Sequence, residues 1–176
     1  MRCFSKKLWL GVVGLVMVSS VFAKNDALST RLVFDHMKVV KASEHDGDEL
    51  YFDVSVYQLN QPTQHIRIPE KPMHWLSQLI AKNTPVTLWT GSVSPKHPVT
   101  LVVSLMDADM SKINPDDVIG SMRVELKNHD GKLVAYWSLP NRHDAPVMTG
   151  STKENTHEFA LITSKNGTYE VYFSLK

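Results

Sequence analysis

Alternating polarity is the feature that most constrains this chain. From position 50 to position 57, the apolar residues Leu, Phe, Val and Val alternate with Tyr, Asp, Ser and Tyr. This period of two is typical of a strand with one buried face. Eight further segments have the composition of strands: 31–41, 63–68, 86–93, 98–106, 118–127, 132–138, 157–164 and 168–175. The sequence therefore predicts an all-β chain.

Turn-forming residues separate several of these segments, at 95–98, 129–131 and 165–167. The Asn-Gly pair in the last of them readily supplies the positive φ angles of a tight hairpin turn. One segment differs, because its apolar residues recur at helical spacing around 73–82. We predict an antiparallel β-sandwich of eight to nine strands with this one short helix. A closed barrel is the alternative.

Residues 1–23 have the three-part layout of a secretory signal. Basic residues near the start precede an apolar stretch from Leu8 to Val18, and Val21-Phe22-Ala23 provides a cleavage site. The stretch is well short of the roughly 20 residues that span a bilayer, so we expect cleavage and no transmembrane segment afterwards. The protein is then exported, periplasmic or secreted, with a single domain over 24–176. This signal suits a Gram-negative bacterium.

Charge and cysteine content exclude several classes of function. Three of the 19 Lys and Arg residues lie within residues 1–23, which leaves 16 against 18 Asp and Glu, a net charge of about −2. A nucleic-acid binder would need a basic surface, so we expect no nucleic-acid partner. The only cysteine, Cys3, lies in the signal. The remaining chain therefore has no disulfide, thiolate zinc site or cysteine nucleophile.

Most of the notable carboxylates lie in two predicted loops. The first, 43–49, reads Ser-Glu-His-Asp-Gly-Asp-Glu, and the second, 107–117, begins with Asp-Ala-Asp and ends with Asp-Asp. Residues two apart in an extended segment point the same way, so Asp107 and Asp109 can share an ion. If consecutive strands run antiparallel, both loops and the 69–85 connection emerge at one end of the sandwich. Acidic oxygens that converge in this way are the ligands that calcium prefers.

The motifs in these loops resemble those of a known family. Residues 103–126 combine a strand, Asp-x-Asp, a polar loop, Asp-Asp-x-Ile-Gly and another strand. They are similar to the third calcium-binding loop of the C2 domain, a calcium- and lipid-binding β-sandwich. Residues 46–54, an acidic turn that runs into a strand with an aromatic residue, look like its first loop. The strand order resembles the permuted version of that fold, in a divergent bacterial form.

This resemblance implies a ligand set and a function. The implied calcium ligands are Asp46 and Asp48 in the first loop, and Asp107, Asp109, Asp117 and, as a substitute, Asp116 in the third. The implied function is that of a monomeric, non-enzymatic module that binds an anionic membrane lipid or a protein when calcium is present. The sequence departs from the family pattern in a third loop that is longer by two residues and in Glu49, which replaces the usual proline.

Two other functions stay open. A metal-free structural or adhesive sandwich could bind a protein or glycan through the 69–85 segment, with Trp75 and Leu76 as contact residues. The same two residues could instead belong to a helix that caps the core. A secreted hydrolase is the third possibility, but the eight histidines include no zinc-type pair and no serine lies in a Gly-x-Ser-x-Gly turn.

Overall fold

The protein is described here by a computed structural model that covers residues 26–42, 44–80, 85–109, 115–139, 151–152, 157–164 and 167–176. The predicted signal at 1–23 lies outside these residues. Within the described part of the chain, no helix is long and apolar enough to cross a membrane.

Strands dominate the described residues, and only one short helix accompanies them. The strands are β1 (Leu28–Ala42), β2 (Glu49–Gln58), β3 (Gln64–Ile68), β4 (Trp75–Leu76), β5 (Val86–Val93), β6 (Val99–Asp107), β7 (Asp117–His129), β8 (Lys132–Ser138), β9 (Ser151–Thr152), β10 (His157–Ser164) and β11 (Gly167–Leu175). The helix is α1 (Ser77–Ile80).

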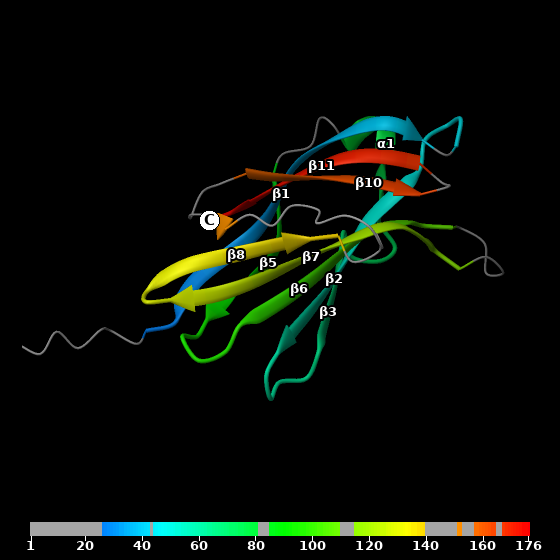
Figure 1. Cartoon of the computed structure of the whole chain (residues 1–176). Coiled ribbons are helices and arrows are strands. Elements are labelled where there is room, and N and C mark those ends of the chain that lie inside the picture. Colours follow the sequence, from blue (N-terminus) through cyan, green and yellow to red (C-terminus); the bar gives the residue numbers. More distant parts are fainter. Residues whose placement is uncertain are drawn as a thin grey trace, which may run out of the picture.

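The strands form two separate antiparallel sheets that pack as layers (Figure 1). The smaller sheet has the order β10-β11-β1-β5. The larger has the order β3-β2-β6-β7-β8-β9, and β4 also pairs with β2. The predicted antiparallel sandwich is therefore confirmed, and the closed barrel is wrong.

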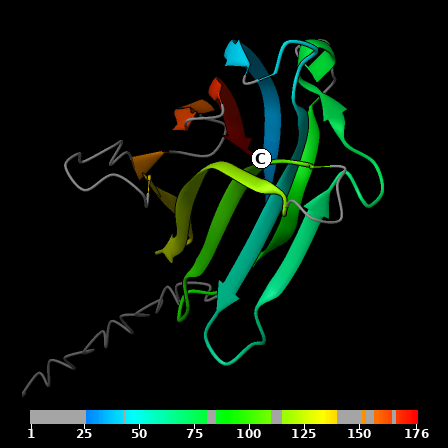
Figure 2. The same cartoon turned by 90° about the vertical axis from the view of Figure 1, so that its right-hand side faces the viewer.

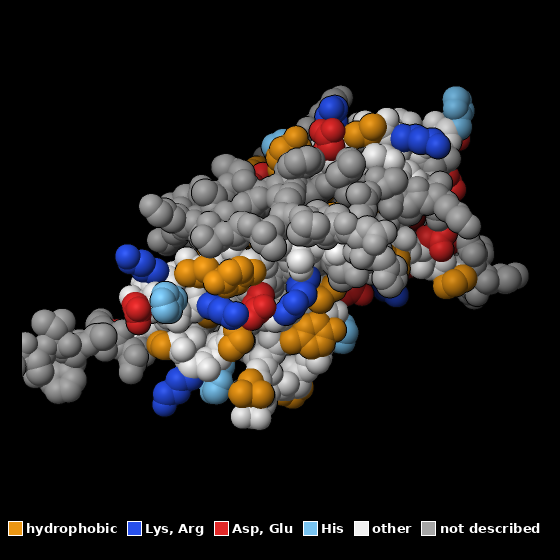
Figure 3. Space-filling model, in the orientation of Figure 1, with side chains coloured by type: hydrophobic (Ala, Val, Ile, Leu, Met, Phe, Trp, Pro, Cys, Tyr) orange, Lys and Arg blue, Asp and Glu red, His pale blue; other side chains and the backbone are white. Residues whose placement is uncertain are grey.

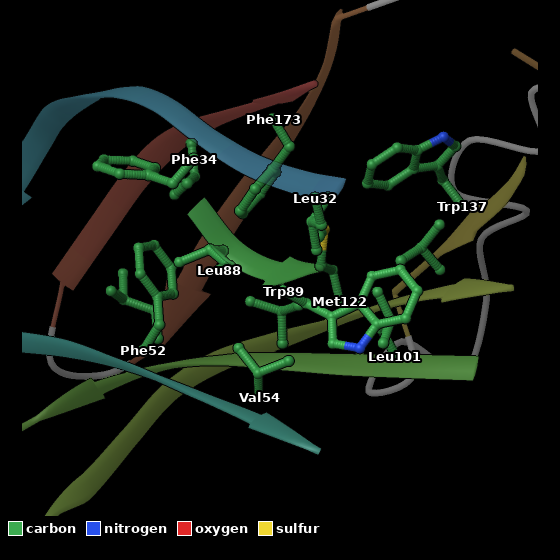
Figure 4. Close-up of a cluster of buried hydrophobic side chains, with 14 of the residues drawn as sticks. Leu32, Phe34, Phe52, Val54, Leu88, Trp89, Leu101, Met122, Trp137 and Phe173 are labelled. Atoms are coloured by element: carbon green, nitrogen blue, oxygen red, sulfur yellow. The ribbon is translucent and has the colours of Figure 1, made fainter. Parts of the chain in front are cut away.

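Alternating side chains explain how the layers hold together. On β2, Leu50, Phe52, Val54 and Val56 are buried, as their period of two predicts. The ring of Phe52 lies 5.1 Å from that of Phe34 on β1 and 6.0 Å from that of Phe173 on β11, so these aromatics join the two sheets (Figure 4). Burial of such large rings is the main source of stability in a sandwich of this size.

The predicted elements are confirmed with two differences. All nine predicted strand segments are present, while the two-residue strands β4 and β9 were not predicted. The predicted helix around 73–82 is four residues long in the described part, 77–80, because Trp75 and Leu76 are extended and pair with Leu50 and Glu49 of β2. Backbone pairing with a neighbouring strand has overridden the helical spacing of the apolar residues.

Candidate functional site

The described parts of the two acidic loops, 44–49 and 107–109, lie side by side at one end of the sandwich, and residues 43 and 110–114 lie outside the described residues. β2 pairs antiparallel with β6, which places Leu50 opposite Asp107. The backbone N–H of Glu49 donates to the Asp107 carboxylate at 3.1 Å, and the N–H of Ala108 donates to the Glu49 carbonyl at 2.7 Å. The predicted convergence of these loops is thus confirmed.

Helix α1, which precedes β5, lies against the first acidic loop. The backbone N–H of Asp48 donates to the Ser77 hydroxyl at 2.9 Å, and the N–H of Ser77 donates to the Asp48 carbonyl at 2.9 Å. Gly47 has φ of 91°, and a Cβ there would lie 2.9 Å from the Ser77 oxygen. A glycine is therefore required for this close approach. Figure 2, which looks onto this end, shows the short green helix beside the cyan connection from β1 to β2.

Asp48 is fully buried and serves the fold. One carboxylate oxygen accepts the backbone N–H of Glu44 at 3.0 Å, and the other accepts the hydroxyl of Tyr169 on β11. These bonds tie the first loop to the opposite sheet. Both oxygens of Asp48 therefore already accept a hydrogen bond, which makes Asp48 a poor candidate for a metal ligand. Its negative charge still acts on neighbouring carboxylates.

Asp107 is the carboxylate that its surroundings perturb most clearly. It is half-buried, and burial, followed by the nearby charge of Asp48, raises its pKa from 3.8 to about 6. Glu44 and Asp109 also raise this pKa, while the hydrogen bond from the Glu49 backbone lowers it. Ionised Asp107 is thus disfavoured first by burial and then by repulsion within an acidic cluster that we define as Glu44, Asp48, Asp107 and Asp109. A cation beside Asp107 would remove that repulsion.

Asp116 has a different environment, on the outer face of the larger sheet. Its carboxylate accepts the Tyr51 hydroxyl at 2.6 Å and lies 3.6 Å from Nη1 of Arg67. The Arg67 guanidinium carbon lies 3.2 Å from the centroid of the Tyr51 ring, a cation–π contact. Burial, and then the hydrogen bond to Asp116, raises the Tyr51 pKa to about 12. Asp116 therefore serves the fold, because its carboxylate is held by the Tyr51 hydroxyl and the Arg67 guanidinium.

The other three predicted calcium ligands are Asp46, Asp109 and Asp117. Asp46 is exposed, and Asp117 is exposed and stands opposite Asp107 in the β6–β7 register. Asp109 is half-buried. Among the residues that the structure describes, no group of three or more His, Cys, Asp or Glu side chains is arranged to hold a metal ion. The described residues therefore form no complete metal site, and of the predicted ligands the structure brings Asp48, Asp109 and Asp117 near Asp107.

The two predicted contact residues of the 69–85 segment lie differently. Trp75 is half-buried, with its ring stacked 6.2 Å from Phe34 and edge-on at 6.1 Å from Phe52. Trp75 covers the edge of the core, but it does so from strand β4, so the predicted capping helix is wrong for Trp75 and Leu76. Leu76 is 41 % exposed, and Met73 and Leu79 beside it are 60 % and 53 % exposed. An apolar surface therefore borders the acidic cluster.

Sequence reasoning did not predict the partners that organise this end. Tyr169 contacts Asp48 across 121 positions, and Tyr51 contacts Asp116 across 65. Contacts so distant in sequence leave no local pattern. The buried partner of Asp48 has one weak signal, since a tyrosine on a strand interior needs a partner for its hydroxyl.

Comparison with known proteins gives one distant structural similarity and no ligand. No protein-family model matches the sequence, and no curated protein matches it. Among solved structures, the chain is similar to a C2 domain of plant extended synaptotagmin 1, with 12 % identity, a TM-score of 0.39 and coverage of 86 % of this chain and 96 % of that one. This is the family that the loop motifs resemble. The similarity concerns the course of the chain and carries no metal or partner over to it.

Proposed function

We propose that this protein is an exported, non-enzymatic binding module that recognises its ligand at the end of the sandwich that carries the acidic cluster, with calcium as a bound ion. The observation that carries the proposal is the half-buried Asp107, whose pKa is raised to about 6 by burial and by neighbouring carboxylates. A site that disfavours its own ionised form gains more from a cation than a solvated acidic turn does.

The chain would hold calcium with few ligands. Asp107 and Asp109 offer carboxylate oxygens from one loop, and Glu44 approaches from the other. Calcium takes about six to eight oxygens, so water, backbone carbonyls or the ligand must complete the shell. We therefore expect weak binding, with a dissociation constant on the order of 10⁻⁴–10⁻³ M.

An anionic lipid headgroup is the ligand that the surface favours. Its phosphate oxygens could complete the calcium shell, while the exposed side chains of Met73, Leu76 and Leu79 meet the apolar part of the interface. Neither contact alone would hold the protein on a membrane firmly. Together they make binding depend on calcium.

Calorimetric titration of the calcium-free protein tests the ion. We expect heat on addition of millimolar calcium, about tenfold weaker binding in Asp107→Asn, and no change in Asp130→Asn. Asp130 is an exposed aspartate in the turn between β7 and β8, with φ of 51°, a conformation that asparagine tolerates. Absence of both heat and a shift in melting temperature would reject calcium.

Co-sedimentation with phosphatidylserine vesicles tests the lipid, and binding that persists in EDTA would contradict the calcium dependence.

The second candidate is a metal-free module that binds a protein or glycan through the 69–85 segment. It is favoured by the donors that already occupy Asp48 and Asp116. An array of immobilised glycans probed in EDTA tests it: Leu76→Ala should lose binding, whereas Asp107→Asn should keep it. Leu59→Ala is the matched control, because Leu59 is 60 % exposed on a different turn, after β2. Binding that Leu76→Ala leaves intact would reject this candidate.

A further inference from the structure

A hollow of about 330 Å³ lies at the other end of the sandwich, between the β5–β6 connection and the β7–β8 hairpin. Its walls include Lys96, His97, Lys127, His129 and Tyr136, and we call it the basic hollow. The nine residues of β6 separate it from the acidic cluster, a distance of roughly 30 Å at about 3.3 Å per residue. Its volume falls at the small end of the range that small-molecule sites occupy.

Positive charge gathers around the hollow although residues 24–176 carry 16 Lys and Arg against 18 Asp and Glu. Figure 3 shows blue and pale blue side chains over this region, at its lower left. Two acids moderate the charge. Glu125 lies 2.9 Å from Nζ of Lys127, and Asp130 lies 3.7 Å from Nε2 of His129. Lys96 makes no ion pair with any residue that the structure describes.

A single buried amide makes this end rigid. Asn128 is 8 % exposed, and its side-chain nitrogen donates to the carbonyls of Val93 at 3.3 Å and of Asp26 at 2.9 Å. Its side-chain oxygen accepts the backbone N–H of Gly131 at 3.0 Å. Asn128 thus ties the end of β5 to the β7–β8 turn. The walls of the hollow are held in place before any ligand arrives, which lowers the entropic cost of binding.

One aromatic side chain shapes the kind of ligand that fits. Tyr136 is 43 % exposed, and Nζ of Lys127 lies 4.9 Å from the centroid of its ring. The ring offers a flat surface for the uncharged part of a ligand, next to a cation for its charged part. The lining residues include no arginine, whose planar fork binds carboxylate and phosphate in a bidentate way. The two lysines of the hollow act as point charges, which is a common way for a protein to bind phosphate.

We propose that the basic hollow binds the phosphate monoester group of a small molecule, with Lys96 and Lys127 on the phosphate and Tyr136 against the remainder. The site is independent of the acidic cluster and of calcium. A soluble phosphate ester and a phosphorylated lipid headgroup share this chemistry, and the experiment distinguishes them.

Titration of the ¹⁵N-labelled protein with glycerol 3-phosphate in EDTA tests the proposal by NMR. We expect saturating shifts of amides in 94–98 and 127–136, with a millimolar dissociation constant, and none with glycerol. Lys96→Gln with Lys127→Gln should weaken binding at least about tenfold. Lys38→Gln is the matched control, since Lys38 also forms an exposed ion pair, 3.3 Å from Glu170, on another face. Competition by phosphatidic acid vesicles would support the lipid headgroup, and its absence a soluble ester.

Two results would overturn the proposal. One is a set of shifts that sodium chloride at equal ionic strength reproduces. The other is unchanged affinity in the double variant while its spectrum shows the native fold. Because every titration is done in EDTA, failure of the calcium proposal would leave this result unaffected.

Discussion

The two ends of the sandwich hold their charges in different ways. At one end the charge is negative and partly inside the fold: Asp48 is fully buried and Asp107 is half-buried. At the other end the cations Lys96 and Lys127 are exposed around a neutral, buried Asn128. Ionisation at the acidic end is therefore coupled to folding. Charges at the basic end are available to a ligand with little effect on stability, because exposed ion pairs contribute at most about 1 kcal/mol.

The largest effect that this comparison predicts is at Asp48. Asp48→Ala leaves the Tyr169 hydroxyl and the Glu44 N–H without their acceptor in a buried site, so we expect a loss of about 3 kcal/mol in the free energy of unfolding. Urea denaturation in EDTA measures it. Asp46→Ala, two positions away and exposed, should change stability by less than about 0.5 kcal/mol. Equal effects of the two substitutions would show that the first loop is not anchored through Asp48.

The corresponding substitution at the other end is Asn128→Ala. It removes three hydrogen bonds to backbone groups, some of which water can replace at the edge of the hollow, so we expect a loss of about 2 kcal/mol. The neighbouring exposed residue provides the control, and Lys127→Gln should alter stability by less than about 0.5 kcal/mol. A larger effect at Lys127 than at Asn128 would contradict the assignment of rigidity to the buried amide.

A smaller effect of opposite sign is expected at Asp107. Its pKa is about 6 in the folded protein against 3.8 ordinarily, so between these values the folded state binds more protons and stability falls as the pH rises. Asp107→Asn keeps the oxygen that accepts the Glu49 N–H and removes the titration. We expect the variant to match the wild type at pH 4 and to exceed it by about 1 kcal/mol at pH 7, after solvent screening.

Thermal unfolding from pH 4 to pH 8 measures this difference. Millimolar calcium should narrow this difference at pH 7, because it binds the wild type more tightly than the variant. A variant that is less stable than the wild type at pH 7 without calcium would contradict the raised pKa of Asp107.

Local patterns predicted the sandwich, and long-range contacts account for what was missed. Period-two alternation and turn residues indicate each long strand, and counting antiparallel strands predicted that the loops at 42–48 and 107–117 share one end of the sandwich. No local pattern indicates that Trp75 is extended, since that depends on pairing with Leu50. The Tyr51–Asp116 bond and the basic hollow likewise join segments distant in sequence, so neither was predicted. Side chains that serve the fold and side chains that can serve a ligand look alike in sequence, and Asp48 and Asp109 are an example.

The most direct test of the calcium proposal is the titration of the Asp107 carboxyl carbon by ¹³C NMR, with and without millimolar calcium. We predict a pKa of about 6 in EDTA, raised by burial and by the charge of Asp48, and a lower value when calcium is present. A pKa near 3.8 in EDTA, or a raised pKa that calcium leaves unchanged, would contradict it.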